Sequence, residues 1–234
     1  MTTPTIVLVH GAFGDSSMWC DVVARLQKEG YSAIAAANPL RDLESDAQYV
    51  ATVTRAEDGP VVLVGHSYAG AVITRAAREV SNVSALVYIA AFQPDEGEDT
   101  LENATRFPGA KMGSDTFSVI ESDGQVELRI LPEHYQDLLA GDLPQATTDI
   151  MAVTQRPVRQ QAVTAQLSGE PAWRSLPSWA LIATQDNAIP AQAQEFMAAR
   201  AGSSVVRVEA SHAVSISQPD AVANLIIAAA KATI

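Results

Sequence analysis

One serine of this chain stands where a buried strand meets a helix, in the segment Val61-Val62-Leu63-Val64-Gly65-His66-Ser67-Tyr68-Ala69-Gly70. A strand that runs through Gly-x-Ser-x-small into a helix is the pattern of a nucleophile elbow, which lifts the serine hydroxyl above the sheet. So sharp a turn excludes bulky side chains two positions before or after the serine, and Gly65 and Ala69 meet that need. The pattern predicts Ser67 as a nucleophile with a strained backbone. A chance strand-to-helix turn is the alternative, and the context counts against it.

A serine hydroxyl needs a neighbouring base to be a good nucleophile at neutral pH, and the chain has four histidines. His212 follows the last predicted strand, and loops at the carboxyl ends of parallel strands hold the sites of α/β sheets. We therefore assign His212 as the base. His66 is interpreted as structural, because its side chain points away from that of Ser67. His134 is interpreted as a surface residue.

The imidazole in turn needs an acid that fixes its tautomer and stabilises the imidazolium. Asp186 lies just past the penultimate predicted strand and 26 residues before His212. The chain order Ser67, Asp186, His212 is the order of triads on this type of sheet. A plain turn aspartate is the alternative interpretation of Asp186, and Asp95, after the fourth predicted strand, is the second candidate for the acid.

The turn after the first predicted strand reads His10-Gly11-Ala12-Phe13. Acyl transfer needs amide N–H groups aimed at the developing oxyanion, and we expect the amides of Ala12 and Tyr68 to supply them. Phe13 and Tyr68 flank the two turns and are predicted to contact substrate. Trp19 is interpreted as core. Three further residues face either the pocket or a small core of their own: Phe107, Met112 and Phe117.

Short apolar runs alternate with amphipathic segments along most of the chain. The runs predict strands over 5–9, 32–37, 61–64, 85–90, 178–183 and 204–208, and the segments between and after them predict helices over 16–29, 45–55, 68–80, 191–201 and 216–230. This alternation is typical of an α/β fold with a mostly parallel six-stranded sheet and helices on both faces. We expect a single domain over residues 1–234.

The alternation breaks after the fourth predicted strand. Residues 93–145 hold 12 acidic and three basic residues, so they carry −9 of the net charge of −12. Long structureless loops are rare in compact domains, so we expect 93–170 to be an inserted cap, mainly helical after Glu133. An irregular solvated excursion is the alternative. A hairpin is predicted from 117–120 and 126–130 around Asp123-Gly124.

Composition excludes several classes of partner. The negative net charge repels phosphate backbones and anionic lipid surfaces, so neither nucleic acid nor membrane is an expected partner. A single cysteine, Cys20, excludes an intrachain disulfide and multi-cysteine metal sites. We expect no metal and no organic cofactor. No apolar stretch reaches the ~18 residues of a membrane span, and no basic leader precedes the first strand, so the expected location is the cytoplasm. The expected partner is a small-molecule ester, and a homodimer is left open.

With these motifs the sequence resembles the α/β-hydrolase superfamily over essentially its full length. More narrowly, it is similar to small bacterial esterases related to plant methylesterases and hydroxynitrile lyases. The matching segments are 6–13, 18–19, 65–70, 184–190 and 211–212. The resemblance implies an α/β-hydrolase fold whose insertion is a cap over the pocket. It also implies a serine hydrolase that cleaves small carboxylic esters, and with the triad named above we expect the reaction to pass through an acyl-enzyme.

Two positions depart from the hydroxynitrile-lyase branch of that resemblance. The branch has a lysine directly after the catalytic histidine and a threonine at the place of Gly11, whereas this chain has Ala213 and glycine. Both departures favour hydrolysis over cyanohydrin cleavage. The second hypothesis is a relative that binds a small ligand without turnover, and haloperoxidase or perhydrolase activity would use the same triad. The acidic cap predicts a preference against anionic substrates, and so for neutral, short-to-medium or aromatic esters.

Overall fold

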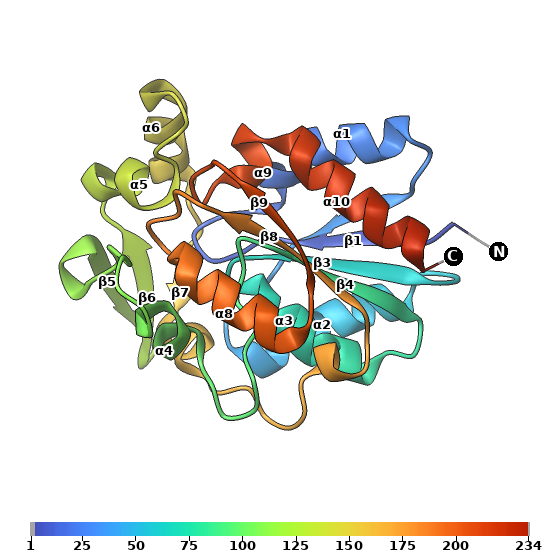
Figure 1. Cartoon of the computed structure of the whole chain (residues 1–234). Coiled ribbons are helices and arrows are strands. Elements are labelled where there is room, and N and C mark those ends of the chain that lie inside the picture. The colour runs from blue at the N-terminus through green and yellow to red at the C-terminus, as the bar shows by residue number, and fades with distance from the viewer. Residues whose placement is uncertain (1–2, 234) are drawn as a thin grey trace.

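The computed structural model describes residues 3–233 and is built on a six-stranded sheet (Figure 1). Its strands are β1 (Thr5–Val9), β2 (Ala33–Ala36), β3 (Val61–His66), β4 (Val83–Ile89), β8 (Ser178–Ala183) and β9 (Ser204–Val208). They lie in the order β2-β1-β3-β4-β8-β9, and every neighbouring pair is parallel. The predicted α/β-hydrolase fold is confirmed, with strand ends shifted by no more than two residues from those predicted.

Helices cover both faces of this sheet (Figure 1). One face carries α1 (Cys20–Lys28), α9 (Val214–Ser217) and α10 (Pro219–Ala232), and the other carries α2 (Leu43–Arg55), α3 (Ala69–Ala76) and α8 (Ala191–Ala201). Successive side chains of a strand point to opposite faces, so Leu8 packs with the first set of helices and Val7 with the second. No helix within residues 3–233 is long and apolar enough to cross a membrane.

Four predicted helices differ from the structure, and polar caps or proline explain three of the differences. The fourth, predicted over 68–80, is α-helical only to Ala76 and continues as a 3-10 turn, η2 (Ala77–Glu79). A 3-10 turn, η1 (Ser16–Trp19), precedes α1, and its N-cap is Asp15, whose carboxylate accepts from the amide of Ser17. Helix α2 begins at Leu43, earlier than predicted, because Asp42 caps it. The single helix predicted over 216–230 is two helices, because Pro219, which has no N–H, starts a new one.

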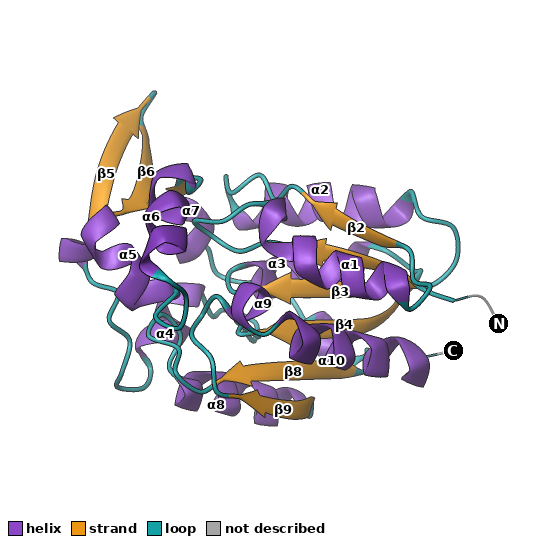
Figure 2. Ribbon diagram, turned by 90° about the horizontal axis from the view of Figure 1, so that it is seen from above, coloured by secondary structure: helices purple, strands orange, loops and turns teal. Residues whose placement is uncertain are grey.

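Residues 93–170 are here named the cap segment. Most of this segment lies beyond the carboxyl ends of the sheet strands, the ends marked by the arrowheads of β3 and β8 (Figure 2). Its helices are α4 (Thr100–Thr105), α5 (Pro132–Leu139), α6 (Gln145–Thr154) and α7 (Gln160–Thr164). The predicted hairpin is present as β5 (Phe117–Ser122) and β6 (Gln125–Ile130), and both turn residues have positive φ. A third antiparallel strand, β7 (Val158–Arg159), was not predicted.

Several acidic residues of the cap segment form ion pairs. Lys111 contacts Asp137 at 2.7 Å, and Arg41 of the sheet domain contacts Glu127 at 2.5 Å. Arg200, on α8, holds Glu98 at 2.7 Å. Burial alone would raise the pKa of Glu98, but hydrogen bonds, chiefly from Arg200, lower it to about 2. The negative charge of this segment therefore serves partly to attach it to the rest of the fold.

Candidate active site

Ser67 forms the turn between β3 and α3, with a φ of 56°. Non-glycine residues occupy this left-handed region where the surroundings impose it, often at functional sites. The amide of Ser67 donates to the carbonyl of Ile89 (3.3 Å), and its own carbonyl accepts from the amide of Phe92 (3.2 Å). A Cβ at Gly65 would lie 2.6 Å from the carbonyl oxygen of Ala69, which explains the glycine there. The turn has the strained geometry that the motif predicts.

Asp186 and His212 lie side by side because β8 and β9 are neighbouring parallel strands in register to their last residues. Nδ1 of His212 and Oδ2 of Asp186 are 2.7 Å apart, and both residues are buried. The other carboxylate oxygen accepts from the amides of Ala188 and Ile189, each at 2.8 Å. The carboxylate is thus fixed by its own turn and presents one oxygen to the imidazole, as a tautomer-fixing acid must.

Two supporting residues were not assigned this role from the sequence. Gln194, on α8, donates from Nε2 to Oδ2 of Asp186 at 2.9 Å. His66, interpreted as structural, donates from Nε2 to the main-chain oxygen of His212 at 2.8 Å. Burial, and then the neighbouring His212, hold the pKa of His66 well below its usual range, so its ring is neutral. The place of His66 beside the nucleophile was the sequence signal for this role, whereas Gln194 had none.

The turns that carry Ala12 and Tyr68 are packed against one another beside Ser67. A Cβ at Gly11 would lie 2.6 Å from Cβ of Ser67, so the glycine allows the backbones to approach. Tyr68 is the N-cap of α3, where amides have no partner within the helix. Within residues 3–233, neither the Ala12 nor the Tyr68 amide donates a backbone hydrogen bond. Both residues line the cavity at Ser67, where free amides can bind an oxyanion.

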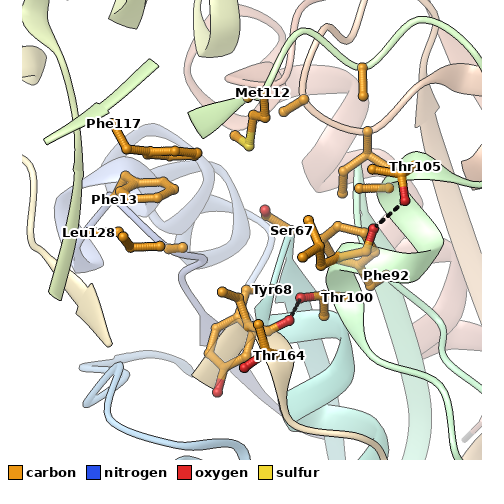
Figure 3. Close-up of a pocket in the computed structure, with 18 of the residues that line it drawn as sticks. Phe13, Ser67, Tyr68, Phe92, Thr100, Thr105, Met112, Phe117, Leu128 and Thr164 are labelled. Carbon is orange, nitrogen blue, oxygen red and sulfur yellow. Dashed lines mark hydrogen bonds between the residues drawn. The ribbon is translucent and has the colours of Figure 1, made fainter. Parts of the chain in front are cut away.

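A cavity of about 410 Å³ lies between these turns and the cap segment, and Ser67 and His212 both line it. Phe13 and Phe117 stack at one side of it, with ring centroids 5.7 Å apart, and Leu128 lies beside them (Figure 3). Tyr68 also lines the cavity, but its hydroxyl donates to buried Asp46 at 2.9 Å. The hydroxyl of Tyr68 is therefore not available to a bound molecule. Met112 lies on the cap side of the cavity (Figure 3).

The remaining sequence candidates lie away from this cavity. Phe107 packs against Phe196 of α8, and Trp19 is buried in the core, as interpreted. Asp95 pairs with Arg174 at 2.7 Å and contacts neither Ser67 nor His212, so the structure favours Asp186 as the acid. His134, expected on the surface, is half-buried on α5. The described residues, 3–233, contain no group of three His, Cys, Asp or Glu side chains arranged to hold a metal ion.

His10, at the end of β1, predicts a pH dependence of stability. Its Nε2 accepts from the amide of Asn38 (3.0 Å), and the guanidinium of Arg156 lies 3.4 Å from the same nitrogen. Burial, together with Arg156, lowers the pKa of His10 to about 4. Between this value and the unfolded value of about 6.5 only the unfolded chain binds the proton, so stability is lost as pH falls.

We expect the free energy of unfolding to fall by about 2 kcal/mol from pH 7.5 to pH 4.5 because of His10 alone. Urea unfolding of the wild type and of His10→Gln at the two pH values measures this contribution. The other titrating groups contribute equally to both proteins, so they cancel in the comparison. The difference between the two pH values should be about 2 kcal/mol smaller in the variant. Equal differences would contradict the assignment of a neutral, buried His10.

Comparisons with known proteins identify the family to which this fold belongs. A family model described as the alpha/beta hydrolase family matches residues 6–225. An alpha/beta hydrolase of Aspergillus novofumigatus, nvfD, is 27% identical over 97% of this chain and 96% of its own length. A carbendazim hydrolyzing esterase of Nocardioides is 32% identical, over 41% of this chain and 45% of its own. A crystal structure of a pyrethroid hydrolase from Sphingobium faniae superposes with a TM-score of 0.81 at 23% identity, covering 99% of this chain and 98% of the other.

Proposed function

Since the chain belongs to the alpha/beta hydrolase family, we propose that it is a serine hydrolase that cleaves neutral carboxylic esters. The observation that carries this proposal is the buried 2.7 Å hydrogen bond between His212 and Asp186, at a cavity that Ser67 also lines. The names of several relatives, among them a carbendazim hydrolyzing esterase, a pyrethroid hydrolase and a putative methylesterase of Arabidopsis thaliana, support ester cleavage.

The proposed reaction has two halves. Oγ of Ser67 attacks the ester carbonyl carbon while Nε2 of His212 takes the hydroxyl proton, and the amides of Ala12 and Tyr68 bind the oxyanion. Collapse of the tetrahedral intermediate breaks the C–O bond, and His212 returns the proton to the leaving alcohol. Water, deprotonated by His212, then attacks the acyl-enzyme, which releases the carboxylic acid and restores Ser67. Asp186 holds Nδ1–H of His212 throughout.

The lining of the cavity supports an uncharged substrate. None of its lining residues is Asp, Glu, Lys or Arg. Three threonines line it, but their hydroxyls already donate to main-chain carbonyls. Thr100 donates to Val163 (2.7 Å) and Thr105 to Leu101 (3.0 Å) (Figure 3), and Thr164 donates to Gln160 (3.1 Å). A charged substrate group would be desolvated there without a charge of opposite sign beside it, which is costly. The preference predicted from the acidic cap thus rests instead on the lack of charged groups at the cavity.

The size and the aromatic wall of the cavity favour the larger of the predicted substrates, which are medium-sized or aromatic esters. A volume of about 410 Å³ lies within the range of pockets that bury drug-sized ligands. The stacked pair of Phe13 and Phe117 offers a flat apolar surface for an aromatic group. We therefore propose medium-sized or aromatic esters over acetate esters.

Two positions count against cyanohydrin cleavage at this site. A side chain at Gly11 would meet Cβ of Ser67 at 2.6 Å, so the turn has no room for a threonine in its present form. Ala213, after His212, is buried and brings no cation to the cavity. Hydrolysis needs neither group, because its charge develops on the carbonyl oxygen near the two amides.

Labelling and turnover together test the proposal. The purified protein should hydrolyse p-nitrophenyl butyrate. A fluorophosphonate should label Ser67, and turnover should fall in proportion to the fraction of protein labelled. The Ser67→Ala variant should not be labelled. As a matched substrate, p-nitrophenyl hemisuccinate places a carboxylate at the end of an acyl chain of similar length. We expect its kcat/KM to be at least about tenfold lower, because the carboxylate would be desolvated in a cavity whose lining has no Lys or Arg to pair with it. No turnover and no label would indicate a ligand-binding relative, and equal use of the two esters would contradict the neutral-substrate proposal.

A further inference from the structure

The loop that carries His212 is attached to the cap segment by hydrogen bonds on both sides of the histidine. Before it, the carboxylate of Asp142 accepts from the amide of Ser211 (3.1 Å) and, through its second oxygen, from the Ser211 hydroxyl. After it, the amide of Ala213 donates to the carbonyl of Leu139 at 2.8 Å. Leu139 is the last residue of α5, and Asp142 lies between α5 and α6.

These contacts satisfy groups that would otherwise lack partners. The last carbonyls of a helix have no partner within the helix, and Ala213 supplies one to Leu139. The same peptide unit, between His212 and Ala213, is held from its other end, because its carbonyl accepts from Nε2 of His66 at 2.8 Å. The elbow therefore holds this peptide unit on one side and the cap segment holds it on the other.

The cap segment holds the loop of the catalytic acid as well. Nδ2 of Asn187, the residue after Asp186, donates to the carbonyl of Asp137 on α5 at 2.7 Å. The carbonyl of Asn187 accepts from the amide of Lys111 at 2.8 Å. The end of α5 thus touches both loops whose side chains form the His212–Asp186 pair. Of these contacts, the ones made by Asp142 come from a side chain and can be removed without changing the backbone.

We propose that Asp142 is a positioning residue for His212, and that through it the cap segment takes part in aligning the catalytic base. This inference rests on the proposed function. Asp142 does not line the cavity at Ser67, so it acts through Ser211 and not on the substrate. Small displacements of a base cost large factors in rate, because proton transfer from the serine depends on hydrogen-bond geometry.

The state of the carboxylate agrees with this role. Partial burial works against the charged form, but the hydrogen bonds from Ser211, with its hydroxyl contributing most, and the nearby hydroxyl of Ser217 outweigh it and lower the pKa of Asp142. Ser211 is itself buried, and its hydroxyl is held by a charged acceptor, which makes a stronger hydrogen bond than a neutral one. An alanine at position 142 would leave the amide of Ser211 without its acceptor, and would leave the Ser211 hydroxyl only the carbonyl of Leu139, at 3.2 Å.

Kinetics of three variants test the proposal. We expect Asp142→Ala to lower kcat about tenfold with KM changed less than about threefold, because alignment and not substrate binding is lost. Asp142→Asn should keep kcat within about threefold of the wild type, since its amide oxygen can accept from the Ser211 amide while its NH₂ donates to the Ser211 hydroxyl. The matched control is Asp149→Ala, an exposed cap aspartate on α6 that accepts from Gln145 and touches neither loop. It should leave kcat and KM unchanged.

Two further readouts separate positioning from a general structural effect. In a His212→Ala background, Asp142→Ala should have no further effect on the residual rate, because the residue through which it acts is gone. The second readout is the downfield proton resonance of Nδ1–H of His212. We expect its exchange with solvent to be at least about fivefold faster in Asp142→Ala and unchanged in Asp149→Ala.

The proton measurement needs no turnover, so failure of the proposed function and failure of this inference are distinguishable. The inference is overturned if the resonance is unaffected in Asp142→Ala. It is also overturned if the loss persists without His212, or if it appears in KM alone. An equal loss in Asp142→Asn would assign the effect to the carboxylate charge and contradict positioning.

Discussion

Asp186→Asn is expected to lower kcat about 10³–10⁴-fold, with KM changed only a few-fold. The carboxylate accepts four hydrogen bonds: from the amides of Ala188 and Ile189 on one oxygen, and from Gln194 and His212 on the other. Asparagine has one oxygen, and the two main-chain donors hold it. Its NH₂ group then faces the ring of His212, which accepts only if the proton moves to Nε2. With Nε2 protonated, His212 is no longer a base for Ser67.

Steady-state kinetics with p-nitrophenyl butyrate measure this effect, and Asp95→Asn is the control. Asp95 was the second candidate for the acid, yet it pairs with Arg174 away from the cavity, so its substitution should change kcat less than about threefold. A large loss in Asp95→Asn together with a small one in Asp186→Asn would reverse the assignment. Circular dichroism spectra of both variants would show whether the fold is retained.

The turn at Ser67 and the loops of Asp186 and His212 could be predicted from the sequence, because short motifs and the order of the strands determine where they lie. The elbow is a local pattern, since the small residues around Ser67 are required by the turn itself. The places of Asp186 and His212 follow from the alternation of strands and helices, because loops at the carboxyl ends of neighbouring parallel strands must meet. These features depend on short stretches of chain and on the strand order that the resemblance implies.

The supporting hydrogen bonds could not be predicted, because they join segments far apart in the chain. Asp142 and Ser211 are 69 residues apart, and His66 lies 146 residues before His212. In the sequence, Asp142 is one of 12 acids in residues 93–145, with nothing to separate it from its neighbours. Its contact depends on how α5 ends against the His212 loop, which is a property of tertiary packing. The break between α9 and α10, by contrast, has a local cause in Pro219 that the sequence displays.

The elbow also makes Gly70 a position of large effect on stability. A Cβ at Gly70 would lie 2.1 Å from the carbonyl oxygen of Phe92 and 3.0 Å from Cβ of Ala91. Backbone atoms cannot rotate away as a flexible side chain can, so α3 or the loop after β4 must move. We therefore expect Gly70→Ala to lower the free energy of unfolding by about 3 kcal/mol or more.

The same substitution should impair catalysis in those molecules that fold. The amide of Phe92 donates to the carbonyl of Ser67 at 3.2 Å, so a displaced Phe92 moves the nucleophile or frees its backbone. Urea unfolding and kcat are to be compared with those of Gly141→Ala, whose Cβ would have nothing nearer than the Gln136 carbonyl oxygen at 3.9 Å. Gly141→Ala should change stability by less than about 0.5 kcal/mol. Equal stability of the two variants would mean that α3 and the Phe92 loop move apart at little cost in free energy. Gly70 would then not be needed for the shape of the elbow.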